Sequence, residues 1–228
     1  MLLSSTYFGP IQWYAKLFAS QGRMVRIEAE ENFIKQTFRN RCVIATANGQ
    51  QTLTIPVAHR EGYAMRDITI SDHGNWQHLH WQAIKTAYGE SAFFEYYQDF
   101  IRPFYIDDGR EAPVRMKYLL DYNIAGMEMM CRILDIDIDW KLTEEFVTPE
   151  PKTNTSDGND EEGFSADDWR YSIRPKNAPK DSSFTPVAYY QVYAMRNGFL
   201  PNLSILDLLF NEGPQAVLTL SDSINRKS

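Results

Sequence analysis

Apolar and polar residues alternate most regularly on either side of Asn48-Gly49, and this pattern predicts a β-hairpin. The flanking runs, 41–47 and 50–56, are rich in Val, Ile, Thr and Leu, which favour strands. A type I′ turn requires a positive φ at both central residues, a conformation that Asn-Gly adopts readily. We therefore expect residues 48 and 49 to form the loop.

This loop fixes the register, so that Ile44 lies opposite Leu53 and Cys42 opposite Ile55. These four alternating side chains form one apolar face. Continuing the alternation towards the N-terminus places Asn40 on the apolar side and its two arginine neighbours on the other face. A buried Asn needs hydrogen bonds, because an unsatisfied amide costs about 1–3 kcal/mol.

The remaining periodic segments predict an α/β fold with a mixed sheet that contains the hairpin and is flanked by helices. Strands are expected at 2–6, 24–29, 67–70 and from 135 onward. Helices are expected at 11–18, 76–88, 91–102, 116–134, 205–213 and 214–220. Asn75 and Ser91 are expected to cap two of these helices, and Ser204 with Asp207 forms a capping box for another. We expect residues 1–228 to form a single domain.

Residues 148–168 interrupt this pattern and carry most of the negative charge. The chain has a net charge of −7, and this stretch holds seven acids and one base. Its first 16 residues contain no aliphatic or aromatic side chain, so it cannot bury enough surface to offset its ordering entropy. We interpret it as a mobile acidic insertion.

Composition narrows the functional classes. The hydrophobic content of 43% supports a packed core, and no apolar run approaches the roughly 20 residues of a membrane span. Outside the acidic stretch the charge is close to neutral, so there is no concentrated basic face for nucleic acid. The N-terminus lacks the basic region of a secretory signal, and Cys42 and Cys131 are expected to be free thiols, which together favour a cytoplasmic location.

The histidines offer little metal chemistry. His78 and His80 are two positions apart on a predicted helix and point in different directions, whereas helical zinc ligands are three or four apart. We expect neither a metal nor another cofactor. His80 lies on the apolar stripe with Trp76, where it is either a hydrogen-bonded core residue or a general base.

Two polar clusters could bind a small-molecule substrate. Lys35, Asn40 and Arg41 could grip a phosphate or carboxylate, or they could be solvated charges beside a structural amide. Gln191 and Asn202 precede the helix N-terminus at Ser204, where anions are favoured. Together with His80 as the catalytic base, these residues form the candidate site.

The ordered set of motifs resembles the WbqC-like proteins of bacteria. The segments that carry the resemblance are Tyr7-Phe8-Gly9-Pro10, Lys35 with Asn40-Arg41, Leu53 with Pro56-Val57, Trp76 with His80 and Tyr88, and Phe199 to Asp207 with Asn211 and Gly213. Many members begin with a Gln-Pro pair, and here Ser5-Thr6 stand in that region. The resemblance covers residues 3–150 and 186–218.

This resemblance implies a link to O-antigen and other surface polysaccharide biosynthesis. One interpretation is a cytoplasmic transferase that uses a nucleotide-sugar or an amino-acid donor, with aminoacyl or glycyl transfer to a sugar as its specific form. The alternative is a non-catalytic module for glycan or nucleotide-sugar binding or assembly, in which Tyr7, Trp13 and Tyr14 form a stacking surface. The two hypotheses differ in whether the polar residues meet at one pocket.

Overall fold

The computed structural model describes the chain except residues 59–61, 107–115, 150–166, 177 and 226–228. Its strands are β1 (Leu2–Ser4), β2 (Val25–Glu28), β3 (Arg41–Thr46), β4 (Gly49–Thr54), β5 (Val57–Ala58), β6 (Thr69–Ile70) and β7 (Trp140–Leu142). Its α-helices are α1 (Ile11–Phe18), α2 (Trp76–Tyr88), α3 (Phe94–Ile101), α4 (Leu119–Ile133), α5 (Ala194–Asn197), α6 (Ile205–Glu212) and α7 (Ala216–Asp222). The expected α/β class, with a hairpin and flanking helices, is confirmed.

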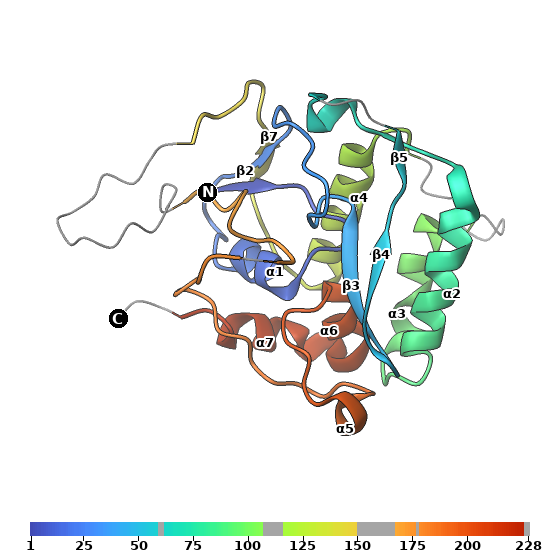
Figure 1. Ribbon diagram of the computed structural model, residues 1–228. Helices are drawn as coiled ribbons and strands as arrows, with labels where there is room; N and C mark the ends of the chain where they lie inside the picture. Colours follow the sequence, from blue (N-terminus) through green and yellow to red (C-terminus); the bar gives the residue numbers. More distant parts are fainter. Residues whose placement is uncertain (59–61, 107–115, 150–166, 177, 226–228) are drawn as a thin grey trace.

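Three small sheets replace the one mixed sheet that the sequence predicts. β1, β2 and β7 form a parallel sheet in the order β1-β2-β7, while β3 pairs with β4 and β5 with β6 in antiparallel pairs. β1, α1 and β2 form a β-α-β unit, since parallel neighbours need a crossover connection. In Figure 1 the hairpin stands between α1 on one side and α2 and α3 on the other.

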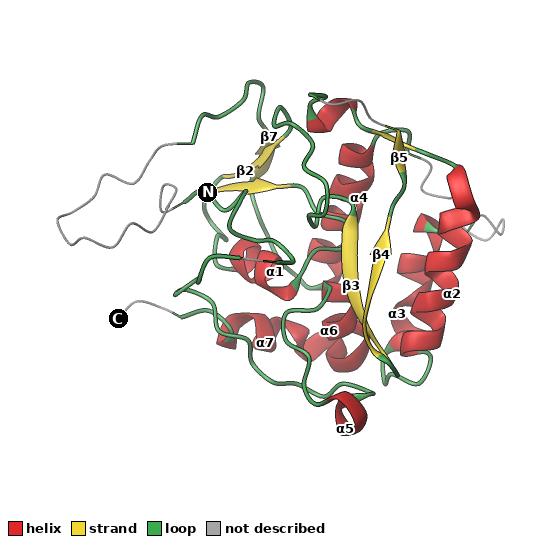
Figure 2. Cartoon of the chain, viewed as in Figure 1, coloured by secondary structure: helices red, strands yellow, loops and turns green. Residues whose placement is uncertain are grey.

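Most of the chain's secondary structure contributes to one hydrophobic cluster, which draws residues from both ends of the sequence. Figure 2 shows helices on both sides of the hairpin, with long loops connecting them. Leu3, Ile27 and Ile44 are completely buried, as are Leu209 and Phe210 of α6. The C-terminal helices therefore pack into the same core as the N-terminal strands.

The predicted hairpin register is wrong by two residues. Cys42 lies opposite Leu53 and Ile44 opposite Gln51, so the loop consists of residues 47 and 48. The reason lies in the turn. Gly49 has a φ of 98°, whereas Asn48 stays outside the positive region, which fits a turn followed by one left-handed glycine rather than type I′.

Several helix and strand ends also differ from expectation. Asn75 is the N-cap of α2, but it has a left-handed conformation and its side chain makes no capping hydrogen bond. The N-cap of α3 is Phe93 and not the predicted Ser91. β7 begins only at Trp140, because the alternating Asp and Ile residues before it lie outside the ladder. The acidic insertion proposed for 148–168 falls largely outside the described residues.

The two terminal motifs of the sequence meet in space. The N–H of Ile11 donates to the carbonyl of Leu203 at 2.9 Å, and the Ser204 hydroxyl donates to the carbonyl of Phe8 at 2.7 Å. Asn202 accepts the N–H of Gln12 at 2.9 Å. The open donors at the start of α1 are thereby satisfied, so this helix end is closed to anions.

Candidate functional site

A groove of about 710 Å³ lies beside α2 and the loop that follows α3. Its volume is in the range of small-molecule sites. Its described lining residues are Ile70, Asp72, Asn75, Trp76, Gln77, His78, Pro103, Phe104, Tyr105, Ile106, Met116, Lys117 and Tyr122. The described lining therefore combines apolar and polar side chains.

Three aromatic side chains form the inner wall of the groove. Trp76 packs edge-to-face on Tyr105 and Tyr122, with ring centroids 6.4 Å and 5.9 Å away. Trp76 is only 4% exposed, and its indole Nε1 has no hydrogen-bond partner within the described part of the chain. Since indole N–H is a donor only, Nε1 is a buried donor that no described residue satisfies.

The rim of the groove is polar and carries both charge signs. Lys117 is the basic residue of the described lining and Asp72 the acidic one, and Asn75, Gln77 and His78 add further polar groups. The described rim therefore has little net charge. Such a mixture can orient a polar ligand without selecting strongly for either charge.

A chain of hydrogen bonds runs from this wall to His80. The hydroxyl oxygens of Tyr105 and Tyr7 are 2.6 Å apart, and the Tyr7 hydroxyl is 2.9 Å from Nδ1 of His80. The chain joins three separate segments: the loop after α3, the loop after β1, and α2. Tyr105 belongs to both the groove and the chain, whereas His80 lies behind the wall.

Burial lowers the pKa of His80 to about 4, against a smaller opposing effect from a backbone hydrogen bond with Thr54. The imidazole is therefore neutral at neutral pH. Burial also raises the pKa of Tyr7 and that of Tyr105 well above the usual value, so both hydroxyls keep their protons. The three side chains of the resting hydrogen-bond chain are therefore uncharged.

Three of the predicted site residues gather at the end of β4. Arg41 is paired with Thr54 in the hairpin, and the backbone of the same Thr54 lies close enough to His80 to affect its pKa. Asn40 is buried and donates from Nδ2 to the carbonyl of Ile55 at 2.9 Å, so the nitrogen of this core amide is satisfied. Asn40 Oδ1 and Arg41 Nε are buried without a partner among the described residues.

The other three predicted residues lie elsewhere, and none of the six lines the groove. Lys35 is exposed. Gln191 is buried and holds its own loop, donating to the carbonyl of Leu200 at 2.9 Å and to Asp207 at 3.1 Å. The Asn202 side chain accepts a hydrogen bond from the Gln12 N–H at the start of α1. The backbone contacts of Gln191 and Asn202 account for both side chains.

The aromatic stacking surface of the alternative hypothesis is wrong at the residues named. Tyr7, Trp13 and Tyr14 are at most 2% exposed. Trp13 donates from Nε1 to the carbonyl of Ser4 at 3.0 Å, within the core. The aromatic residues that line the groove are Trp76, Tyr105 and Tyr122, and the Tyr7 ring packs directly behind two of them.

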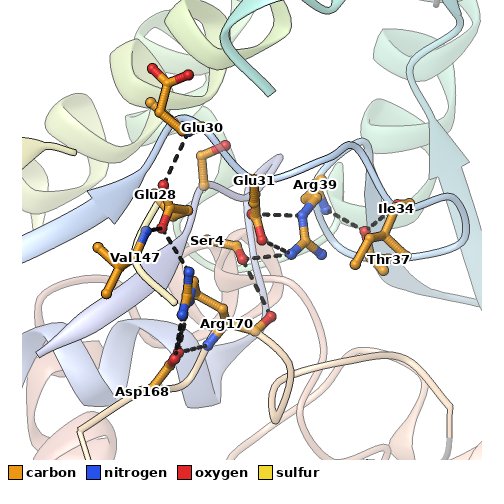
Figure 3. A network of polar contacts seen from close by, with 12 residues as sticks. Ser4, Glu28, Glu30, Glu31, Ile34, Thr37, Arg39, Val147, Asp168 and Arg170 are labelled. Carbon is orange, nitrogen blue, oxygen red and sulfur yellow. Dashed lines mark hydrogen bonds and ion pairs between the residues drawn. The ribbon is translucent and has the colours of Figure 1, made fainter. Parts of the chain in front are cut away.

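Buried charges close the carboxyl end of the parallel sheet, the place where open α/β sheets often bind ligands. Arg39 contacts Glu31 through Nε at 2.8 Å and donates to the Ser4 hydroxyl at 2.7 Å. Figure 3 shows these contacts beside a second group around Arg170. The space left among these residues is about 10 Å³, which leaves no room for a substrate.

The second group uses residues from opposite ends of the chain. Arg170 donates to Glu28 at 2.7 Å and to Asp168 at 2.6 Å (Figure 3). Asp168, expected in the mobile acidic insertion, is thus fixed in the core, and Arg39, expected on the face opposite the apolar one, is 3% exposed. Because each carboxylate has a partner, we interpret the network as structural.

Sequence reasoning missed most of the groove wall. Trp76 and His80 were singled out on a helix, but Tyr105, Lys117 and Tyr122 were not. Tyr105 follows Pro103 in a short aromatic run, which is the one available signal. Within the described residues, no group of three or more His, Cys, Asp or Glu could hold a metal ion. In the same part of the chain, no helix combines the length and apolarity of a membrane span.

Comparison with known proteins identifies a family that matches this chain. A model of the WbqC-like protein family matches residues 5–219. The uncharacterized protein Rv1507c of Mycobacterium tuberculosis is 24% identical over 226 residues, covering 94% of this chain and 94% of the relative. No solved structure matches the chain.

Proposed function

Because the chain belongs to the WbqC-like protein family, we propose that it is a cytoplasmic transferase in the biosynthesis of bacterial surface polysaccharide. The reaction that fits this setting is transfer of an aminoacyl or glycyl group to a sugar, with a nucleotide-sugar or activated amino acid among the substrates. The groove beside α2 is the substrate site of this proposal.

One observation carries the assignment of the site. Trp76, Tyr105 and Tyr122 present a buried aromatic wall next to polar rim groups, and the Trp76 N–H is unused within the described chain. Aromatic faces pack against the C–H faces of sugar rings, and side-chain donors and acceptors select hydroxyls. This combination supports a sugar-bearing ligand.

The polar residues divide into two roles under this proposal. Lys117 lies on the rim and can bind a phosphate or carboxylate of the donor. Arg41 and Asn40 support the end of β4 that contacts His80, while Gln191 and Asn202 hold the loops around the core. Lys35 is available for a ligand only at the protein surface.

Thermal-shift measurements test the proposal directly, because a bound ligand raises apparent stability by mass action. The panel is UDP-glucose, UDP-N-acetylglucosamine, glycine and methyl α-D-glucopyranoside. We expect a sugar-bearing compound to protect the wild type, and Trp76→Phe to reduce that protection while the ligand-free melting temperature changes little. Full protection of Trp76→Phe would contradict the assignment of the groove.

A non-catalytic binding module is the second candidate. The observation that favours it is the position of His80, which lies behind the wall and does not line the groove. Incubation with a protecting pair of compounds, followed by mass spectrometry of the products, separates the two candidates. A new covalent product supports the transferase, and protection without any product supports the binding module.

A further inference from the structure

A second groove, of about 370 Å³, lies between β2 and the loop that follows β7. Its described lining includes Arg26, Lys141 and residues 143–147, and none of these lines the groove beside α2. In Figure 1 the hairpin stands between β2 and β7 on one side and α2 on the other. We propose that this second groove binds a sugar phosphate, with Arg26 and Lys141 holding the phosphate. The site is separate from the substrate groove, so it does not depend on the proposed function.

The two cations stand side by side on the outer face of the parallel sheet. Arg26 of β2 and Lys141 of β7 are direct partners in the register, and neighbouring strands lie about 4.8 Å apart. Val25 and Ile27, on either side of Arg26, are completely buried, whereas Arg26 and Lys141 are exposed. Two adjacent positive charges match a phosphate monoester, which carries about two negative charges near neutral pH.

No contact in the described part of the chain neutralises this pair. Neither side chain makes an ion pair or a hydrogen bond with a described residue. Like charges directly opposite each other on neighbouring strands destabilise a sheet. A lysine on the edge strand β7 protects against pairing with other chains, but Arg26 lies on the central strand β2, where it has no such role. A bound anion would remove the repulsion between the two side chains.

The buried network of Figure 3 fixes the wall of this groove. The Thr143 hydroxyl donates to Oε1 of Glu28 at 2.6 Å, and the Val147 N–H donates to Oε2 at 3.2 Å (Figure 3). Glu28 is itself held by Arg170 at 2.7 Å. Both ends of the loop after β7 are therefore tied to the strand that carries Arg26. A groove formed in advance lowers the ordering cost of binding.

The rest of the lining indicates what the phosphate is attached to. Phe146 is 46% exposed, and an aromatic face packs against the C–H face of a sugar ring. Glu144 and Glu145 are exposed, and their carboxylates only accept hydrogen bonds, so they suit hydroxyl groups. The same carboxylates repel further negative charge. The groove therefore fits one phosphate on a polyhydroxylated ring better than a diphosphate.

Isothermal titration calorimetry with α-D-glucose 1-phosphate tests the site. We expect the wild type to bind this compound more tightly than glucose or inorganic phosphate, and added NaCl to weaken the binding by screening. Arg26→Gln and Lys141→Gln should each weaken it about 10-fold, as loss of a charged hydrogen-bond donor implies. Lys85→Gln is the matched control, because Lys85 is an exposed lysine on α2 outside both grooves.

The same titration distinguishes the two grooves. Trp76→Phe, at the substrate groove, should bind glucose 1-phosphate as the wild type does. Loss of binding in Trp76→Phe but not in Arg26→Gln or Lys141→Gln would overturn the proposal, and would instead support the substrate groove as the sugar site. Absence of binding by the wild type would also overturn it, and would leave the proposed function to its own ligand panel.

A second test needs no ligand. At low ionic strength, Arg26→Gln and Lys141→Gln should each raise the melting temperature by about 1–3 °C, because either change removes the repulsion. The double variant should bring no further gain, whereas Lys85→Gln should give no such rise. Additive gains would show that the two charges do not face each other and would overturn the proposal. A lower melting temperature in both single variants would overturn it as well, because each charge would then have a structural partner.

Discussion

The guanidinium of Arg39 donates hydrogen bonds to both carboxylate oxygens of Glu31, with Nε 2.8 Å from Oε1 and Nη2 2.5 Å from Oε2. The two side chains are almost completely buried, and they link the end of β2 to the segment before the hairpin. A bidentate pair of this kind fixes two backbone segments relative to each other. Its energetic contribution can be measured, because a more exposed ion pair, Glu30 with Arg66, lies next to it.

Replacing Glu31 with Gln should destabilise the protein by about 3–5 kcal/mol, since Arg39 would remain buried without its countercharge. The matched control is Glu30→Gln, because Glu30 pairs with Arg66, whose side chain is 44% exposed. An exposed pair contributes about 0–1 kcal/mol. Urea unfolding of both variants gives the comparison, and equal losses would contradict the structural role of the buried network.

Asn202→Ala should destabilise the protein by about 1–2 kcal/mol, the usual cost of losing a side-chain cap at a helix start. Its Oδ1 accepts the N–H of Gln12, and its φ of 53° is a further strain for Ala. The measurement is urea unfolding, together with thermal-shift titration of the protecting compound. If Asn202 contacts the ligand instead, the titration midpoint will shift in the variant even after correction for its lower stability.

Two buried groups, His80 and Asp207, should make the free energy of unfolding depend on pH in opposite directions. His80 has its pKa lowered to about 4, so the stability that its neutral form contributes is lost as pH falls from about 6.5 through 4. Burial raises the pKa of Asp207 to about 6, so the stability of its protonated form is lost as pH rises from about 3.8 through 6. Each shift is equivalent to about 3 kcal/mol.

The variants His80→Gln and Asp207→Asn separate the two effects. Between pH 4 and 7, His80→Gln should lose less stability than the wild type on acidification. Asp207→Asn should lose less than the wild type as the pH is raised over the same interval. Urea unfolding at each pH provides the free energies, and variant curves that run parallel to the wild type would contradict the assigned pKa shifts.

Gly213→Ala should destabilise the protein by more than about 1–2 kcal/mol, the cost of a left-handed backbone for a residue with a Cβ. The φ of Gly213 is 54°, and an added Cβ would lie 2.5 Å from Cδ1 of Phe93. Gly22→Ala is the control, because Gly22 also has a positive φ but has nothing within 4 Å of an added Cβ. The difference between their melting temperatures isolates the steric contact with Phe93.

The parts of the fold that depend on local periodicity were predictable. α1 and α2 follow the apolar repeat closely, and α6 begins after Ser204, whose hydroxyl accepts the N–H of Leu206 at 3.3 Å. The predicted role of Asp207 in the capping box was wrong. Its carboxylate instead accepts hydrogen bonds from the hydroxyls of Tyr88 and Tyr189, at 2.9 Å and 2.6 Å. Local spacing cannot reveal a tertiary competitor of this kind.

The site was less accessible to sequence reasoning for the same reason. The groove wall joins Trp76 to Tyr105 and Tyr122, whose contacts are set by packing rather than by spacing along the chain. The charged network also joins distant positions: Arg170 and Glu28 are 142 residues apart. His80 was recognisable on its helix, but its link to the groove depends on Tyr7 and Tyr105, which meet only after folding.

The contacts between the start of α1 and residues 202–204 have a consequence for biosynthesis on the ribosome. Partners some 190 positions apart cannot meet until residues 202–204 have been translated. Until then, the N–H groups at the start of α1 can bond only to water. Closure of such a long loop is also slow, because of its entropic cost. Premature termination before residue 205 would therefore compromise the start of α1 as well as the C-terminal helices.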